Sequence, residues 1–144
     1  IPHTARFTEE SKPNVTKTDE EWQKQLTSDE YYVLRQAETE ARFRGYTDTT
    51  DAGTYVCKGC GAPLYSSTHK FDSGCGWPAF DDCFDKAVTT RLDPDGVRIE
   101  IICTNCHSHL GHVFTGEKGH DSVRHCVNSC CLTLEAPKDD TQAQ

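Results

Sequence analysis

Nine cysteines lie in a chain of 144 residues that contains no methionine, and four of them form two CxxC pairs. The pairs are Cys57 with Cys60 and Cys103 with Cys106. Each spacing lets two sulfurs converge on one ion, and two such pairs complete a tetrahedral Cys₄ zinc site. Because four thiolates close the coordination shell, we predict one structural Zn²⁺ ion. The alternative is a redox-active CxxC, which two equivalent copies of the motif fit poorly.

A further cysteine, Cys126, lies in a segment of β-character between an arginine and an asparagine. Alternate residues of a strand share a face, so Arg124, Cys126 and Asn128 are expected to point the same way. A neighbouring arginine favours the thiolate, which is the reactive form of cysteine. We therefore consider Cys126 a candidate nucleophile. The alternative is a buried small hydrophobic residue beside a surface arginine.

Three histidines, His107, His109 and His112, follow the second CxxC pair closely. Imidazole titrates near neutral pH and is the usual proton donor in chemistry at pH 7. Because four cysteines already complete the zinc shell, these side chains are not required as ligands, and we consider them candidate acids. The alternative is that one or two of them are additional metal ligands or surface residues.

Cys75 lies between two glycines in the segment SGCGWPAF. Glycine on both sides gives a mobile, exposed loop, which suits a sulfur that must travel to a partner. Trp77, two residues later, offers an apolar wall for a small group such as a thioether methyl. The alternative is a core tryptophan in a turn.

Two helices must precede these motifs. Thr18 with Glu21 and Thr27 with Glu30 each fit a capping box at the start of a helix. The first helix carries two apolar residues at helical spacing, and the second helix carries three. We expect the second helix to end near a glycine. These residues are Trp22 and Leu26 for the first, and Tyr31, Leu34 and Ala41, with the stop at Gly45, for the second.

From Gly53 onward the pattern changes to short β-rich runs between turns. The expected strands are 54–56, 97–102 and 124–134, with a hairpin turn at 93–96 before the second of them. We predict a mainly β fold with short N-terminal helices. Its boundaries are a flexible N-terminal arm at 1–17, a single domain at 18–136 and a polar tail at 137–144.

Charge and composition restrict the class of protein. Fifteen Lys and Arg against 23 Asp and Glu give a net charge of −8, which disfavours nucleic acid as a partner. No run of about 18 apolar residues is present, so we expect no membrane association. The odd number of cysteines argues against a secreted disulfide framework and favours a reducing intracellular compartment. We expect the cytoplasm, or an organelle reached through an upstream transit segment that has been removed before Ile1.

Four motifs, taken in order, resemble the methionine sulfoxide reductase B family: CxxC, SGCGWPAF, CTNCHSHLGHVF and RHCVNS. The match covers about residues 20–135. The resemblance implies a zinc-clasped fold of two small antiparallel sheets, with the zinc remote from the active site. It also implies reduction of the R-epimer of methionine sulfoxide, in oxidised proteins or as the free amino acid, by a monomer that thioredoxin recycles.

The resemblance implies a role for each matching residue. Cys126 matches the nucleophile and Cys75 the resolving cysteine, whose disulfide thioredoxin reduces. Trp77 matches the residue that packs on the substrate methyl group, and Phe114 belongs to the same substrate-binding set. The remaining matches are polar groups around the sulfoxide oxygen (His109, His112 and Asn128), the arginine before the nucleophile (Arg124) and the zinc ligands (Cys57, Cys60, Cys103 and Cys106).

Two positions depart from the family pattern. Some members have an aspartate four residues after the second histidine of HLGH, where this chain has Gly116 followed by Glu117. Whether Glu117 replaces that aspartate is open. Cys130 and Cys131 stand where serine or alanine is usual, either as spare resolving thiols or as small buried residues, and Cys83 has no assigned role.

Two other classes of function are compatible with parts of this pattern. A zinc-held β-domain without catalysis can bind a protein or a small ligand, since a fold does not determine a function. Such a module has no need of an RxCxN strand beside a histidine cluster. A zinc-dependent nucleic-acid binder is disfavoured by the acidic charge and the lack of a basic stripe.

Overall fold

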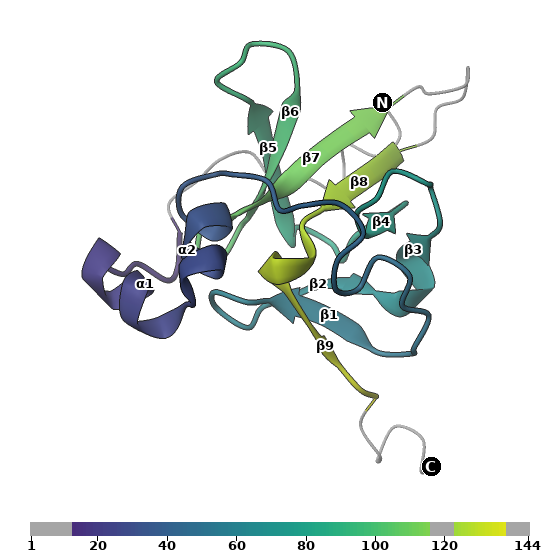
Figure 1. Ribbon diagram of the computed structural model, residues 1–144, viewed down its shortest axis with the longest axis horizontal. Coiled ribbons are helices and arrows are strands. Elements are labelled where there is room, and N and C mark those ends of the chain that lie inside the picture. The colour runs from purple at the N-terminus through teal and green to yellow at the C-terminus, as the bar shows by residue number, and fades with distance from the viewer. Residues whose placement is uncertain (1–12, 116–122, 138–144) are drawn as a thin grey trace.

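The computed structural model describes residues 13–115 and 123–137. In these ranges the chain forms two helices, two short 3₁₀ turns and nine strands (Figure 1). They are α1 (Asp19–Gln25), α2 (Ser28–Leu34), β1 (Thr54–Cys57), β2 (Pro63–Ser66), η2 (Ser67–His69), β3 (Lys70–Phe71), β4 (Ala79–Phe80), β5 (Val88–Leu92), β6 (Ile99–Cys103), β7 (His109–Thr115), β8 (Val123–Val127), η4 (Ser129–Cys131) and β9 (Leu132–Glu135).

The strands form two antiparallel sheets, as the family resemblance implies. The smaller sheet has the order β2-β1-β9, and the larger has the order β3-β4-β8-β7-β6-β5. The expected single strand at 124–134 divides into β8 and β9, because the 3₁₀ turn η4 carries the chain from the larger sheet to the smaller one (Figure 1). The hairpin turn at 93–96 lies between β5 and β6, where Gly96 has a φ of 77°.

Both predicted capping boxes are present, and they start α1 and α2 at the expected residues. Trp22 of α1 and Leu34 of α2 are buried in the core. The predicted end of α2 at Gly45 is wrong, since the helix ends at Leu34. Ala41 is exposed and gives a longer helix no apolar residue to bury. The chain instead turns through Ala37, which has a φ of 58°.

Aromatic packing joins the two sheets beneath β8, the strand that carries Cys126. The ring of Tyr65 on β2 stacks on Phe80 of β4, with ring centroids 4.2 Å apart. The Tyr65 hydroxyl lies 2.9 Å from Nδ1 of His125 on β8. All three side chains are buried. Because β4 and β8 are neighbours, this packing determines where the side chains of β8 lie on the opposite face.

Parts of the predicted boundary segments lie outside the described residues, namely 1–12 of the N-terminal arm and 138–144 of the tail. At 13–17, the Val15 N–H donates to the Asn105 carbonyl at 2.9 Å, so this stretch lies against the second CxxC turn. The domain boundaries stay a prediction. Among the described residues, none of the helices has the length and apolar character needed to cross a membrane.

Candidate metal centre and active site

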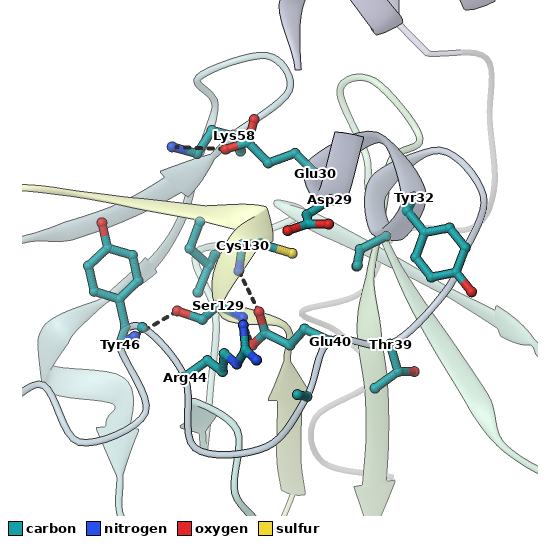
Figure 2. A pocket seen from close by; sticks show the side chains of 14 residues that line it. Asp29, Glu30, Tyr32, Thr39, Glu40, Arg44, Tyr46, Lys58, Ser129 and Cys130 are labelled. Carbon is teal, nitrogen blue, oxygen red and sulfur yellow. Dashed lines mark hydrogen bonds and ion pairs between the residues drawn. The ribbon is translucent and has the colours of Figure 1, made fainter. Parts of the chain in front are cut away.

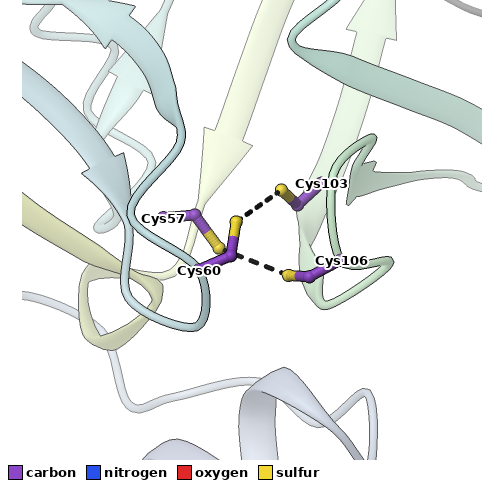
Figure 3. Close-up of side chains that lie close together, drawn as sticks. All are labelled: Cys57, Cys60, Cys103 and Cys106. Carbon is purple, nitrogen blue, oxygen red and sulfur yellow. Dashed lines mark hydrogen bonds between the residues drawn. The ribbon is translucent and has the colours of Figure 1, made fainter. Parts of the chain in front are cut away.

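The four CxxC cysteines converge from different sheets. Cys57 ends β1 of the smaller sheet and Cys60 lies in the turn after it, whereas Cys103 ends β6 of the larger sheet and Cys106 lies in the turn after that strand. The Cys57–Cys106 sulfurs are 3.7 Å apart, the Cys60–Cys103 sulfurs are 3.6 Å apart, and all four lie within 4.8 Å of one another (Figure 3). Tetrahedral Zn–S bonds of about 2.3 Å require sulfurs about 3.8 Å apart. The four cysteines are therefore positioned to bind a metal ion.

The two CxxC turns have the same backbone shape. In each, the residue after the second cysteine donates its N–H to the carbonyl of the first, at 2.8 Å for Gly61 and 2.7 Å for His107. Both residues have a positive φ, 80° and 61° respectively. His107 thus occupies in the second CxxC turn the position that Gly61 occupies in the first. It belongs to the metal centre, unlike His109 and His112.

The chemistry of the four thiols also favours a cation. Hydrogen bonding with Cys103 and Cys106 raises the pKa of Cys57 well above its usual range. Hydrogen bonds among the four thiols lower the pKa of Cys60 and Cys106 while that of Cys103 is also raised, so the four do not ionise together without a cation. A coordinated divalent ion deprotonates all of its thiol ligands. Arg35, the C-cap residue of α2, supports the arrangement, because its Nη1 donates to the Cys106 carbonyl at 3.0 Å.

A second pair of thiols lies in a cavity of about 290 Å³ on the larger sheet. Cys126 of β8 is flanked by Ala79 of β4 and His112 of β7. The sulfur of Cys75 lies 2.9 Å from that of Cys126. Gly74 and Gly76 have φ values of 75° and 92°, which permit the tight turn that brings Cys75 to the strand.

The sequence predicts that Arg124 favours the Cys126 thiolate; Arg124 does lower the pKa of Cys126, but other groups outweigh this effect. Arg124 Nη1 does donate to the Cys126 sulfur at 3.0 Å. Burial and the neighbouring Cys75 outweigh it and raise the pKa of Cys126 to about 12. Burial alone would raise the pKa of Cys75, but hydrogen bonds from Cys126 and Ser73 outweigh burial and lower it. With the sulfurs in contact, Cys75 is therefore the more acidic member of the pair.

Aromatic and polar side chains complete the cavity. Trp77, Phe114, Arg124, His112 and Asn128 all line it. The Arg124 guanidinium lies 4.6 Å from the centre of the Phe114 ring, across the β7–β8 pair. Asn128 Nδ2 donates to the Leu110 carbonyl at 2.9 Å, which holds its amide in place.

The two remaining histidines have different positions. His112 is part of the cavity wall and its Nε2 lies 2.7 Å from Asp93 Oδ2. The described cavity wall does not include His109, whose Nδ1 lies 2.7 Å from Oε2 of the buried Glu100. The two imidazole rings are 5.5 Å apart. Proximity to the thiols therefore favours His112 over His109.

Glu40 is the residue of the site that the sequence least suggested. Its carboxylate accepts the N–H groups of Ser129 and Cys130, at 2.5 Å and 3.0 Å (Figure 2). Its own N–H donates to Asn128 Oδ1, and its carbonyl accepts the indole N–H of Trp77 at 3.1 Å. One residue of the segment after α2 thus positions both Asn128 and Trp77. No short-range pattern in the sequence signals these contacts.

A larger cavity of about 660 Å³ lies on the other side of Glu40, between α2, η4 and the segment after α2 (Figure 2). Cys130 lines it and is half-buried. Cys131 is fully buried and directs its thiol to the His109 carbonyl, and Cys83 is also buried. The burial of Cys83 and Cys131 favours packing roles. Gly116 and Glu117 lie outside the described residues.

A metal-binding cluster that joins two sheets, together with a separate thiol pair in a small cavity, is typical of a metal-stabilised thiol oxidoreductase. Residues 26–136 match the SelR domain family. The chain belongs to this family, which confirms the resemblance seen in the sequence.

Two relatives illustrate the likeness. Peptide methionine sulfoxide reductase B2, chloroplastic, of Arabidopsis thaliana is 52% identical over 131 residues, covering 89% of this chain and 64% of that protein. Peptide methionine sulfoxide reductase MsrB of Hahella chejuensis is 45% identical over 134 residues, covering 90% of this chain and 96% of that protein.

Proposed function

We propose that this protein is a peptide-methionine (R)-S-oxide reductase that uses Cys126 as nucleophile and Cys75 as resolving thiol. The observation that carries the proposal is the pair of sulfurs 2.9 Å apart in a cavity walled by Trp77 and Phe114. Those aromatic faces suit the methyl and methylene groups of a methionine side chain. A cavity built from one set of chiral side chains accepts one sulfoxide epimer, which the family resemblance assigns as R.

The first step is attack of the Cys126 thiolate on the sulfoxide sulfur. This attack forms a bond between the Cys126 sulfur and the methionine sulfur, and the sulfoxide oxygen takes one proton from His112. The resulting hydroxyl group then moves from the methionine sulfur to the Cys126 sulfur as the bond between the two sulfurs breaks, which releases methionine and leaves Cys126 as a sulfenic acid. Burial and the neighbouring Cys75 raise the pKa of Cys126, and separation of the two sulfurs when substrate binds would remove the effect of Cys75. Arg124 then remains beside Cys126 to favour its anion.

The second step closes the cycle. The Cys75 thiol attacks the Cys126 sulfenic acid, which expels water and forms a disulfide. An external dithiol then exchanges with this disulfide, and we infer that thioredoxin supplies it. We place the monomeric protein in a reducing compartment, the cytoplasm or an organelle, where such a reductant is available.

We assign the metal as zinc, held by Cys57, Cys60, Cys103 and Cys106. A closed shell of four thiolates suits zinc and supplies structural stability rather than chemistry at the substrate. The ion would join the turns after β1 and β6, and thereby hold the smaller sheet to the larger one.

The substrate assignment predicts epimer selectivity. With racemic methionine sulfoxide and excess dithiothreitol, we expect the R-epimer to disappear while the S-epimer persists. Chiral chromatography measures the rate of reduction of the free amino acid and the rate for a blocked peptide form. The ratio of these two rates gives the preference between free and peptide-bound sulfoxide. Consumption of the S-epimer, or of neither epimer, would contradict the proposed function.

Replacement of Cys75 tests the resolving role. Cys75→Ser is expected to reduce one equivalent of sulfoxide per protein and then to stop under thioredoxin. Since Cys75 contributes to the raised pKa of Cys126, the variant should also alkylate at Cys126 at lower pH than the native protein does. Peptide mass mapping after iodoacetamide treatment over a pH series measures this shift. Undiminished cycling with thioredoxin would assign the resolving role to another thiol, such as Cys130.

A further inference from the structure

The imidazole of His112 is held by a carboxylate that lies 19 residues earlier in the chain. Its Nε2 lies 2.7 Å from Oδ2 of Asp93, in the turn between β5 and β6. Four residues after this histidine the chain has Gly116, which has no side chain. The β5–β6 turn therefore brings a carboxylate to His112 that does not depend on position 116.

The carboxylate of Asp93 is itself held by the turn. Its Oδ1 accepts the Asp95 N–H at 2.9 Å. Its backbone N–H donates to the Arg98 carbonyl, and its carbonyl accepts the Gly96 N–H, both at 2.8 Å. These bonds leave Oδ2 directed at His112, and the two side chains are only 15% and 10% exposed. The hydrogen bond from His112 lowers the pKa of Asp93, so its carboxylate is ionised at neutral pH.

We propose that Asp93 is a positioning residue for His112, holding the imidazole with Nε2–H toward the β5–β6 turn and leaving Nδ1 to serve the sulfoxide oxygen. This inference rests on the proposed function. The ionised carboxylate accepts the Nε2–H of the ring, whether or not Nδ1 also carries a proton. When the Nδ1 proton passes to the sulfoxide oxygen, the ring becomes the neutral Nε2–H form and keeps its bond to Asp93. Water then returns a proton to Nδ1.

Other charged groups lie around this pair, but they have partners of their own. Glu100 stands opposite His112 on β6, yet its carboxylate bonds Arg91 and His109. Among the described residues, Asp93 is the carboxylate bonded to His112. Glu100 of β6, Arg98 in the turn before β6 and His109 of β7 face His112. Cys126 and Arg124 of β8 and Cys75 of the glycine-flanked loop also face it.

Asp93→Asn tests the proposal with little change in shape. The side-chain oxygen can still accept the Asp95 N–H, while the new amide N–H₂ faces His112 Nε2 and forces it to accept a hydrogen bond. The proton of the neutral ring then sits on Nδ1, and the doubly protonated ring loses its counter-charge. We expect kcat at pH 7 to fall about 100-fold, within the range of general-acid contributions, with KM little changed. The basic limb of the pH profile should move to lower pH.

A matched control lies two residues away. Asp95→Asn removes the same charge from the same turn, but the Asp95 carboxylate bonds Val97 and Arg98 rather than His112. We expect this variant to keep the native rate and pH profile. Long-range ¹H–¹⁵N spectra of the His112 ring give a readout that does not depend on activity. They should show Nε2–H in the native protein and Nδ1–H in Asp93→Asn.

Two outcomes would overturn the proposal. One is an Asp93→Asn protein with native rate and pH profile. The other is a loss of rate in which the pH profile and the His112 tautomer stay unchanged, as a purely structural role would give. If the native protein reduces no sulfoxide, the proposed function fails, and the tautomer spectra still decide whether Asp93 determines the protonation of His112.

Discussion

Cys126→Ser is expected to lower methionine sulfoxide turnover by at least about 1,000-fold, as loss of a catalytic nucleophile does in other enzymes. A serine hydroxyl ionises far less readily than a thiol and cannot form the sulfenic acid that stores the transferred oxygen. The substitution is nearly isosteric at a half-buried position, and Arg124 can donate to the new oxygen. The fold and metal content should therefore be native, as circular dichroism and metal analysis measure.

The matched control is Cys130→Ser, which changes another half-buried thiol that lines the larger cavity on the far side of Glu40. We expect this variant to keep full kcat/KM with dithiothreitol. Native turnover by Cys126→Ser, or an equal loss in Cys130→Ser, would contradict the assignment of the nucleophile.

Loss of the metal is expected to unfold the domain. Zinc in small cysteine sites contributes about 10–16 kcal/mol to folding. A domain of this size has a total stability of about 5–15 kcal/mol. Cys57 is buried at the junction of the two sheets, so Cys57→Ser leaves an incomplete shell where the smaller sheet joins the larger one. We expect it to release zinc and to lose its cooperative thermal transition.

Metal analysis and thermal melts of the native protein, with and without a strong chelator, measure the same effect without a substitution. Cys130→Ser again serves as control, because its sulfur is not part of the metal cluster. A metal-free protein that melts cooperatively at the native temperature would contradict the structural role of the ion.

The features that the sequence predicted well depend on residues close together in the chain. A capping box needs only positions three apart, and both boxes are present at Thr18 and Thr27. The local spacing of the two CxxC pairs likewise indicates metal binding, and the fold needed only to bring one pair to the other. Local rules therefore predicted the helix starts, the cysteine cluster and the strands β1, β6, β8 and β9.

The features that the sequence missed depend on contacts between distant segments. The residues after Leu34 have good helix formers among them, yet Glu40 bonds Asn128 and the turn that follows it, so the segment crosses the site instead of continuing α2. The contact between Asp93 and His112 joins positions 19 apart. Neither contact has a signature in spacing or composition.

The histidine cluster shows the same limit in another form. His109 and His112 are three residues apart, and in a regular strand they would point to opposite faces. An irregularity in the β6–β7 register near Ile101 and Ile102 lets the two rings lie 5.5 Å apart. A register shift of this kind is decided by packing against the neighbouring strand, which the sequence of one strand does not contain.

The central claim is that Cys126 and Cys75 carry out a redox cycle on methionine sulfoxide. Intact-mass spectrometry of the reduced protein, after incubation with excess R-sulfoxide and no reductant, tests it most directly. We predict a loss of two hydrogens, one equivalent of methionine formed, and a disulfide that peptide mapping places between Cys75 and Cys126. An unchanged mass, or a disulfide that joins other cysteines, would contradict the account.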